Sequence, residues 1–454
     1  MAAPARAIVL AAGMGTRMKS TQPKVLHEIC GRPMLWYTLS ALAAAGVQET
    51  VVVTNAVVEP RIGPLLATFG ARSVVQQPQR GTGHAVQIGL RALSPESGTV
   101  VVAYGDMPLV SAQIFADVIG AVRADDAAGL GLTTALMPLP SSFGRVIRHG
   151  DSVAKIVEER DCSPAERAVN EMNAGIYAYD ERALRSVIDD LRDDNVQREL
   201  YLTDTVALLL AAGLQVVPVA CADYRLVLGV NDRVELAQAR ALLNRSLCEQ
   251  HMRSGVTIVD PATTYLEPGL VIGADSIVYP NTAIGGATVI GANAVLGPNS
   301  RIANATIGDG VQITESVVLD TQLAAHVRVG PFAHLRQGNV VGADARVGNF
   351  VELKNTTLHA AAKANHLAYL GDAEVGAGAN IGAGTITCNY DGKHKHRTEI
   401  GPGAFVGSNS SLVAPVRIGA GAQTGAGAVV IRDVGDGERV VGNPARPLVK
   451  KSSV

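Results

Sequence analysis

The second half of this chain carries an aliphatic residue at every sixth position, and Gly or another small residue usually follows it. A period of six fits neither an amphipathic helix nor a hairpin sheet. It is typical of hexapeptide β-helices, in which each hexad supplies one short strand and a turn while the aliphatic side chain points inward. The repeat therefore predicts a parallel β-helix, whose wide side faces favour side-by-side assembly. The phase holds over three runs: Ile272, Val278, Ile284, Ile290, Leu296 and Ile302; Leu323, Val329, Leu335, Val341, Val347 and Leu353; and Ile400, Val406, Leu412, Ile418, the weaker member Thr424, and Val430.

The first half follows a different pattern, in which short runs rich in Val, Ile and Tyr alternate with helical segments. Such alternation predicts a mostly parallel α/β sheet with ligands at the carboxyl ends of its strands. A long helical pattern without a strand then precedes the repeats. We expect an α/β domain over residues 1–233, a linker helix over 234–254 and the β-helix over 255–454. The expected strands are AIVLAAG, ETVVVTN, ARSVVQQ, GTVVVAYGD and GIYAYD, and the expected helices include MLWYTLSALAAAG and AQIFADVIGAVRA.

Composition limits the setting in which the chain works. Its 454 residues are 47% hydrophobic and 18% charged, with a net charge of −2, so no excess of cations drives binding to nucleic acid or a membrane surface. The most apolar stretch, DTVALLLAAGLQVVPVACADY, is interrupted by Gly213, Gln215 and Pro218 and predicts a helix, a turn and a strand rather than a membrane span. We expect no signal peptide, because Arg6 and Gly13 bracket a short strand-like run. Scattered cysteines imply no disulfide framework and favour a reducing cytoplasm: Cys30, Cys162, Cys221, Cys248 and Cys388.

The stretch LAAGMGTRMKSTQPK, which follows the first expected strand, has the features of a phosphate-binding loop. Gly13 and Gly15 allow backbone N–H groups to approach a phosphate chain, and Arg17 and Lys24 can balance its charge. The P-loop NTPase pattern is absent, and the dinucleotide fingerprint fails because Met18 stands where its third glycine should be. The alternative is a plain strand-to-helix turn with two surface cations.

This stretch resembles the signature LxxGxGTRxxxxxPK of sugar-nucleotide pyrophosphorylases. The resemblance implies a Rossmann-like mixed sheet and a loop that wraps a nucleoside triphosphate, with Arg17 and Lys24 on its phosphates. The chemistry implied is in-line attack by a sugar 1-phosphate on the α-phosphorus, with pyrophosphate leaving. The matching positions are Leu10, Gly13, Gly15, Thr16, Arg17, Pro23 and Lys24.

Other residues of the first half fit a nucleotide, a sugar and a metal ion. Gln76 precedes GTGH, and its amide can offer a donor and an acceptor together to uracil. Asp106 ends the apolar run VVVAYGD, where a carboxylate can hold Mg²⁺ over a triphosphate or, alternatively, cap a helix. The resemblance to uridyltransferases assigns Asn231 to the metal beside Asp106. It assigns Glu158 and Asn173 to the sugar, although alone they would suit a surface acid and a turn former. The whole set expected to bind UTP or the UDP-sugar is Leu10, Ala11, Ala12, Gly13, Lys24, Gln76, Gly81, Thr82, Tyr104, Gly105, Asp106, Gly144, Glu158, Asn173 and Asn231.

Polar residues within the repeats raise the question of a second site. A polar residue on such a coil usually belongs to a solvated turn, and His366 alone would suit a structural histidine. Arg336 and Lys354, however, fall on neighbouring turns and could clamp one phosphate. The segment TCNYDGKHKHRTEIG breaks the period, so we expect it to project from the coil, and projecting loops are where sites are built.

The repeats resemble those of left-handed β-helix acetyltransferases at four segments: PFAHLRQG, GNFVELKN, NHLAYLGDAEVGAGANIGAGTITCNYDG and FVGSNSSLVAPV. Over nearly its whole length the chain resembles the bifunctional bacterial N-acetylglucosamine-1-phosphate uridyltransferase / glucosamine-1-phosphate acetyltransferase family. That resemblance implies acetyl transfer from acetyl-CoA to glucosamine 1-phosphate, then Mg²⁺-dependent uridylyl transfer from UTP. The product, UDP-N-acetylglucosamine, supplies peptidoglycan and lipopolysaccharide synthesis. The family also implies a homotrimer with each acetyl-transfer site shared between subunits.

The same resemblance implies roles for residues of the repeats. His366 would be the general base that deprotonates the amine, a task that suits a neutral imidazole near pH 7. Arg336 and Lys354 would bind the sugar phosphate, and Tyr369, Asn380 and Tyr390 would hold the sugar. One of Arg432, Arg439 and Arg446 would contact coenzyme A, without a basis for choosing among them. The KHKHR run over 393–397 could touch coenzyme A from a neighbouring subunit, although such a run usually marks a solvated loop. The expected acetyl-CoA set is Ala383, Asn389, Tyr390, Ser408 and Ala426.

Two other hypotheses remain open at this stage. One is a single-activity sugar-1-phosphate nucleotidyltransferase whose β-helix only assembles subunits. A pure scaffold would not need a set such as Arg336, Lys354, His366 and Tyr390. The other is a regulatory nucleotide-binding module without turnover, which Asp106 disfavours together with Asn231, because sensing does not require a metal pair.

Overall fold

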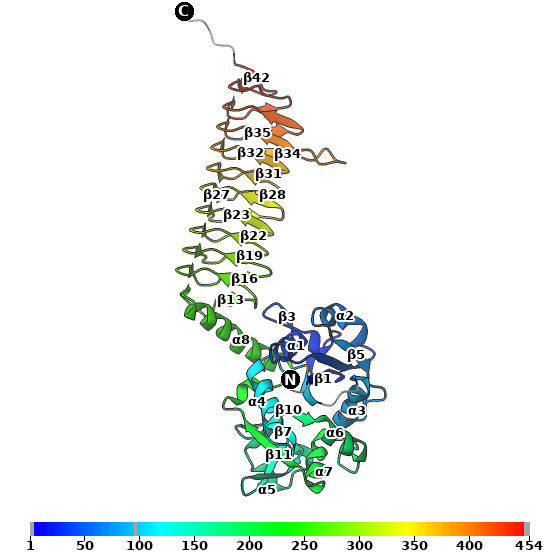
Figure 1. Cartoon of the computed structure of the whole chain (residues 1–454). Helices are drawn as coiled ribbons and strands as arrows, with labels where there is room; N and C mark the ends of the chain where they lie inside the picture. The colour runs from blue at the N-terminus through cyan, green and yellow to red at the C-terminus, as the bar shows by residue number, and fades with distance from the viewer. Residues whose placement is uncertain (1–3, 95–97, 449–454) are drawn as a thin grey trace, which may run out of the picture. The chain divides into compact units, whose positions relative to one another are not determined.

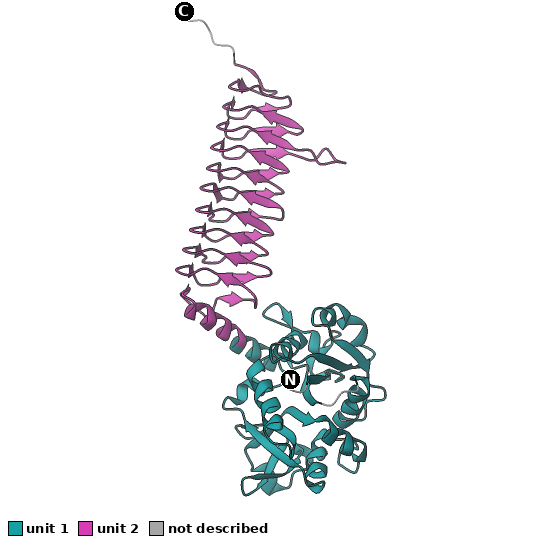
Figure 2. Cartoon of the chain, in the orientation of Figure 1, with its two compact units in different colours: residues 1–242 teal, residues 243–454 magenta. Residues whose placement is uncertain are grey.

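The computed structural model of the protein describes residues 4–94 and 98–448. The chain divides into two compact units, Met1–Leu242 and Leu243–Val454 (Figure 2). The division falls within the long helix α8 (Arg233–Arg253), in the segment where the sequence shows a helical pattern without a strand. Within the described residues, no helix combines the length and the apolar character needed to cross a membrane.

Unit 1 is built on a mixed sheet of nine strands, and it contains the strands expected in the first half. The strand order is β11-β7-β10-β6-β1-β4-β5, with the β8–β9 hairpin attached to β10. β1 pairs in parallel with β4 and β6, whereas β10 runs antiparallel between β6 and β7. The strand bounds are β1 Ala5–Leu10, β4 Glu49–Thr54, β5 Arg72–Val75, β6 Thr99–Tyr104, β7 Ala128–Leu136, β8 Arg145–His149, β9 Ser152–Val157, β10 Glu171–Asp180 and β11 Gln215–Ala220; β2 (Glu28–Ile29) and β3 (Arg32–Pro33) form a separate pair.

Helices cover both faces of this sheet (Figure 1). Along β1, Ala7 and Val9 pack into a core with α1, α2 and α4, while Ile8 and Leu10 pack into another core with α3, α6 and α7. All of β1 is therefore buried between the two layers, and its carboxyl end leads into an exposed loop. The helices are α1 Met34–Ala44, α2 Glu59–Ala67, α3 Thr82–Ala92, α4 Ala112–Arg123, α5 Pro164–Arg167, α6 Glu181–Val187 and α7 Thr205–Ala211.

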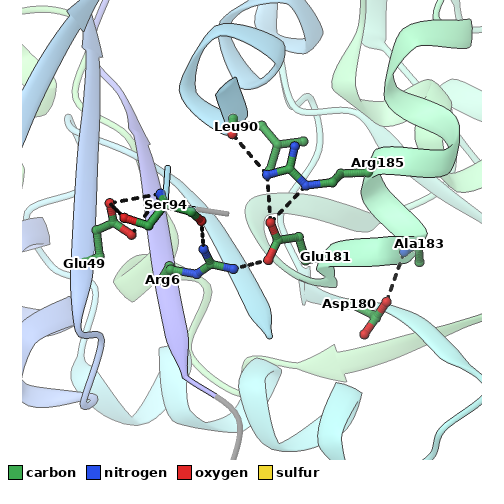
Figure 3. A network of polar contacts seen from close by, with 8 residues as sticks. All are labelled: Arg6, Glu49, Leu90, Ser94, Asp180, Glu181, Ala183 and Arg185. Atoms are coloured by element: carbon green, nitrogen blue, oxygen red, sulfur yellow. Dashed lines mark hydrogen bonds and ion pairs between the residues drawn. The ribbon is translucent and has the colours of Figure 1, made fainter. Parts of the chain in front are cut away.

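A buried charge network ties the beginning of β1 to α6 (Figure 3). Arg6 forms an ion pair with Glu181 and donates a hydrogen bond to the Ser94 carbonyl oxygen. Arg185 donates to the other Glu181 oxygen from Nε at 2.9 Å and from Nη2 at 2.8 Å. Because Arg6 and Glu181 are nearly inaccessible to water, removing Glu181 would take the carboxylate partner from a buried guanidinium, whereas removing Arg6 would leave Glu181 paired with Arg185 alone. This network lies at the amino end of β1, opposite the end that leads into the glycine-rich loop.

Unit 2 is the parallel β-helix that the six-residue period predicts (Figure 1). Its short strands stack into three sheets, which begin at β12 (Thr257–Ile258), β13 (Tyr265–Leu266) and β14 (Val271–Ile272). All strand pairs along the stack are parallel, apart from the terminal antiparallel pair of β41 (Arg439–Val441) and β42 (Arg446–Pro447). Every aliphatic residue of the three runs is buried, and together they form one continuous core.

The phase slips of the repeat do not interrupt the coil. Between the first two runs, Ile307, Ile313 and Val318 occupy inward positions and are fully buried. The change of phase therefore comes from shorter turns, and the inward positions stay filled. Thr424 is also buried, and its Oγ1 accepts a hydrogen bond from the Gly407 backbone N–H at 2.9 Å. A hydroxyl can therefore replace an aliphatic group in this core when its polar atom has a partner.

Candidate active sites

The loop after β1 passes close against Lys24 at a glycine. Gly15 has φ 61°, and a Cβ on it would lie 2.7 Å from the Lys24 Cβ, so only glycine fits this close approach. Two side chains also fix the loop in place: the Ala12 carbonyl oxygen accepts hydrogen bonds from Asn55 at 2.8 Å and from Gln79. These bonds use the carbonyl oxygen of Ala12 and leave the loop's neighbouring N–H groups available to an anion.

A cavity of about 430 Å³ lies against this loop. The loop itself, the strand end at Tyr104 and the first turn of α3 form its walls. Gly105 is not among its lining residues; its backbone N–H instead bonds to the Leu10 carbonyl oxygen at 3.0 Å. Residues predicted to bind UTP that do line the cavity are Leu10, Ala11, Ala12, Gly13, Lys24, Gln76, Gly81, Thr82, Tyr104, Asp106 and Asn231.

A second cavity, of about 620 Å³, shares Tyr104, Asp106 and Asn231 with the first. It contains the residues predicted to hold the sugar, and Arg17 lines it as well. Lys24 thus belongs to the smaller cavity and Arg17 to the larger one, with the shared residues between them. The predicted sugar-binding residues along its wall are Gly144, Glu158 and Asn173.

Lys24, Asp106 and Asn231 converge on one point between the cavities. The Lys24 ammonium forms an ion pair with the Asp106 carboxylate and lies 3.1 Å from the Asn231 Oδ1. A single cationic group therefore contacts both oxygens that the sequence assigned to a metal. Carboxylate and amide oxygens are hard ligands that suit Mg²⁺, so the residues present fit a divalent cation.

Glu158 and Asn173 occupy different environments in the larger cavity. Burial raises the pKa of Glu158, with further contributions from Asp204 and Asp161, while a 3.0 Å hydrogen bond from the Thr203 hydroxyl opposes them. The Asn173 amide is already engaged, because it donates to the Tyr177 hydroxyl at 2.7 Å and accepts from the Gly175 N–H at 3.0 Å.

The engaged amide of Asn173 supports the wall of the cavity. Gly175 has φ 76°, and a Cβ on it would lie 2.7 Å from the Tyr104 ring. Asn173 therefore stabilises the bulge in β10 on which the Tyr104 ring packs. A contact between the Asn173 amide and a sugar would have to replace or share these bonds.

His366 lies exposed at the end of β30 (Lys363–His366), on the surface of unit 2. Its Nδ1 is 2.6 Å from the Asn349 Oδ1, on the preceding coil. Because the amide oxygen is an acceptor, Nδ1 is the donor in this contact, which in a neutral ring leaves the lone pair on Nε2. Sequence reasoning missed Asn349, although GNFVELKN contains it and the repeat places it one coil from His366.

Three cations gather near one another on the same unit. The pKa of Lys354 is lowered, first by contact with Lys395 of the loop over 389–397, then by partial burial, and also by Arg336; Asp372 opposes this effect. Arg336 also forms a 3.0 Å ion pair with Glu352. Neighbouring ammonium and guanidinium groups of this kind attract a phosphate. Lys395 lay within the KHKHR run that sequence analysis left without a defined role.

Tyr369 and Asn389 meet over Gly371. A Cβ on Gly371 would lie 2.4 Å from the Tyr369 hydroxyl and 2.8 Å from the Asn389 Nδ2, so the missing side chain leaves room for both. Tyr390 follows on the loop, exposed, with its hydroxyl bonded to the Gly392 carbonyl oxygen at 2.7 Å. The loop extends sideways from the coils beside β34 (Ile386–Cys388), as the break in the period predicts (Figure 1). Asn380 lies on β33 (Asn380–Ile381), which pairs with β30.

The remaining residues predicted for acetyl-CoA share one corner of the coil with His366. Each directly precedes a turn residue with positive φ. Leu367 follows His366, Gly384 follows Ala383, Asn409 follows Ser408 and Gly427 follows Ala426. Backbone hydrogen bonds of 2.7 Å and 2.8 Å join successive turns at this corner. The corner therefore forms a line of small residues leading away from the histidine. Its members are His366, Ala383, Ser408 and Ala426.

Comparisons with known proteins find a nucleotidyltransferase domain within unit 1 and hexapeptide repeats within unit 2. Residues 7–194 match the family model "MobA-like NTP transferase domain", residues 265–361 match "GMPPB C-terminal domain", and residues 397–432 match "Bacterial transferase hexapeptide (six repeats)". The chain is 43% identical over 434 residues to the "Bifunctional protein GlmU" of Brevibacillus brevis, covering 95% of this chain and 93% of that protein. It is 45% identical to the proteins of the same name from Pelobacter propionicus (96% and 95% covered) and Mycolicibacterium vanbaalenii (96% and 90% covered).

Proposed function

Because this chain belongs to the family of bifunctional GlmU proteins, we propose that it carries out two group transfers of UDP-N-acetylglucosamine synthesis. It is a bifunctional enzyme: an α/β nucleotidyltransferase unit is followed by a left-handed parallel β-helix with acetyltransferase activity. Unit 2 acetylates glucosamine 1-phosphate with acetyl-CoA, and unit 1 joins the product to UMP from UTP. The observation that carries the proposal is the pair of cavities in unit 1 that share Tyr104, Asp106 and Asn231.

For uridylyl transfer, the two cavities suit the two substrates. UTP would occupy the smaller cavity, against the glycine-rich loop, and N-acetylglucosamine 1-phosphate the larger one. The α-phosphorus would then lie at the shared wall, where a phosphate oxygen of the sugar phosphate attacks it and pyrophosphate leaves. Such a step depends on positioning and charge neutralisation more than on a covalent nucleophile. Lys24 and Arg17 would supply positive charge from the two sides.

A divalent cation, Mg²⁺ by the chemistry of its ligands, would be held by Asp106 and Asn231. When bound, it would neutralise charge on the phosphate oxygens. The ammonium of Lys24 contacts both side chains, which supports the view that this point favours positive charge.

For acetyl transfer, His366 would act as the general base. With its Nδ1 proton bonded to Asn349, the Nε2 lone pair can accept a proton from the amine of glucosamine 1-phosphate. The neutral amine then attacks the thioester carbonyl, an amide bond forms and the coenzyme A thiolate leaves. Arg336, Lys354 and Lys395 would hold the sugar phosphate, and Tyr369 and Asn380 the sugar.

We also propose a homotrimer in the cytoplasm. The described cysteines form no disulfide, which fits a reducing compartment. Three apolar side chains on successive coils, Phe332, Phe350 and Leu367, are more than half exposed beside His366. Neighbouring copies packed on this corner would bury these side chains and shield the acetyl-transfer site from water.

Two separate assays test the proposal. One contains enzyme, glucosamine 1-phosphate and acetyl-CoA; the other contains enzyme, Mg²⁺, UTP and N-acetylglucosamine 1-phosphate, and both are followed by mass spectrometry. His366→Ala should abolish acetyl transfer and leave uridylyl transfer intact, and Asp106→Ala should do the reverse. Product in the second assay alone would make the β-helix a scaffold. Loss of both activities in either variant would contradict independent sites.

A further inference from the structure

The side chain of Gln76 has its donor half occupied before any nucleotide binds. Gln76 follows β5, lines the 430 Å³ cavity and is almost completely buried. Its Nε2 donates to the Gly81 carbonyl oxygen at 2.9 Å and lies 3.3 Å from the His84 Nδ1. A carbonyl oxygen only accepts, so the nitrogen of the amide must face Gly81, and the His84 Nδ1 must offer a lone pair. Within the described part of the chain, the Gln76 Oε1 has no hydrogen-bond donor.

The surroundings of His84 favour the neutral ring that this arrangement requires. The pKa of His84 is lowered chiefly by burial and then by the positive charges of Arg80 and Arg91, against a hydrogen bond with the Pro78 backbone that raises it. His84 lies in the first turn of α3. It is absent from the described residues that line either cavity, so any effect on a nucleotide must pass through a neighbour.

The orientation of the Gln76 amide decides which pyrimidine it can accept. Uracil presents an N3–H donor on the edge where cytosine presents an N3 lone pair. A fixed Oε1 can accept from uracil N3–H and repels cytosine N3, whereas a rotated amide would offer its NH₂ to cytosine. Gln76 therefore serves as an acceptor, instead of offering the donor and acceptor together that the sequence suggested.

We propose that His84 is a positioning residue for nucleobase selection, which holds the Gln76 amide with its oxygen directed to uracil. Gly81 and His84 take the two N–H groups of the amide, one each, and leave only the acceptor for the base. This inference rests on the proposed binding of UTP in the smaller cavity. It assigns a function to the histidine of the GTGH turn, which the proposed mechanism does not otherwise use.

The test compares four variants, of which one is Gln76→Ala, with the wild-type enzyme in the uridylyl-transfer assay, with UTP and CTP as alternative substrates. His84→Leu keeps the approximate shape and removes the acceptor, while His84→Asn can replace Nδ1 with an amide oxygen. His149→Leu is the matched control, since His149 is exposed on β8 and lines neither cavity. Acetyl transfer in the same preparations measures the amount of enzyme with a folded unit 2, and circular dichroism checks the folding of unit 1.

We expect His84→Leu to lower the UTP-to-CTP ratio of kcat/KM by about three- to tenfold, the effect of one net hydrogen bond. The change should be in the KM for UTP more than in kcat, and His84→Asn should keep the ratio within about twofold of wild type. An unchanged ratio in His84→Leu, with Gln76→Ala still lowering it, would overturn the inference and leave the proposed function in place. A wild-type enzyme that does not use UTP would overturn both.

Discussion

At the scale of single residues, the candidate sites depend on contacts that hold functional groups in one protonation state or orientation. The Asn349 oxygen selects the tautomer of His366, and two acceptors hold the amide of Gln76. Burial raises the pKa of Glu158. In each case the surroundings of the functional residue determine which protonation state or hydrogen bond it can offer to a substrate.

His27 permits a prediction about stability and pH. It is buried, its Nε2 has no hydrogen-bond partner within the described residues, and its pKa is lowered by burial and by Arg233. Below its ordinary pKa of about 6.5 the unfolded chain gains a proton that the folded chain does not. The contribution of His27 to stability should therefore be constant above this pH and decrease as the pH falls below it.

The measurement is urea unfolding of unit 1 within the full chain, for wild type and His27→Leu, between pH 5 and 8. The difference in unfolding midpoint between the two proteins should change in favour of the leucine variant as the pH falls. A difference that is the same at every pH would show that His27 does not titrate differently on folding.

At the scale of secondary-structure elements, two acids attach the projecting loop over 389–397 to its coil: Glu374, which forms an ion pair with Arg397, and Asp372. The Asp372 carboxylate accepts from Asn389 at 2.5 Å and from Asn355 at 2.7 Å, and its backbone carbonyl oxygen accepts from the Thr398 N–H at 3.2 Å. Both ends of the loop therefore meet at Asp372. The loop carries Tyr390 and Lys395, which lie near the predicted sugar-phosphate site.

Asp372→Asn should loosen this attachment, because an amide offers one acceptor oxygen to two donor amides. We expect the KM for glucosamine 1-phosphate to rise by about three- to tenfold, as expected for one lost hydrogen bond, while uridylyl transfer stays unchanged. Limited proteolysis should cut the loop faster. Asp344→Asn is a suitable control, since Asp344 is exposed with a similar left-handed backbone, φ 59° against 49° for Asp372. Equal KM values for the two variants would exclude this role for Asp372.

At the scale of the whole molecule, one corner of the β-helix departs from the residue type that its backbone favours. Turn residues at this corner have positive φ, and other coils place Asn281, Asn299 and Asn409 there. Phe332 and Phe350 instead occupy the position with φ 59° each, stacked at 5.4 Å between ring centroids and at least half exposed. Left-handed backbone and exposure both disfavour such residues in an isolated chain, which is why we place the subunit contact there.

The double variant Phe332→Asn/Phe350→Asn should weaken the trimer without weakening the fold, because asparagine suits the left-handed turn. Sedimentation velocity should show monomers at concentrations where the wild type is trimeric. Acetyl transfer should fall, and uridylyl transfer should persist. Tyr265→Asn, at an exposed tyrosine on the first coil, should leave assembly unchanged. A double variant that is monomeric with full acetyltransferase activity would contradict a site shared between subunits.

Much of this architecture is determined by the sequence itself. The six-residue period predicted the β-helix because each coil repeats the same strand and turn, so the pattern is local and regular. The alternation of strands and helices predicted the α/β unit for the same reason. The glycine-rich signature predicted a turn after the first strand, and Gly15 is required where the chain passes against Lys24; phosphate binding by this loop stays a prediction.

Only the tertiary structure decided which side chains meet. Asp106 and Asn231 stand 82 and 207 residues from Lys24 along the chain. The pairing of β1 with β6 and a 2.9 Å hydrogen bond from the Val230 N–H to the Asp106 carbonyl oxygen help to bring them to one point. The repeat already placed Asn349 one coil from His366, whereas the contact of His84 with Gln76 and the two-ended attachment at Asp372 had no signal in local spacing. Such contacts depend on long-range packing, which places side chains in space by the register of distant strands and not by their order in the chain.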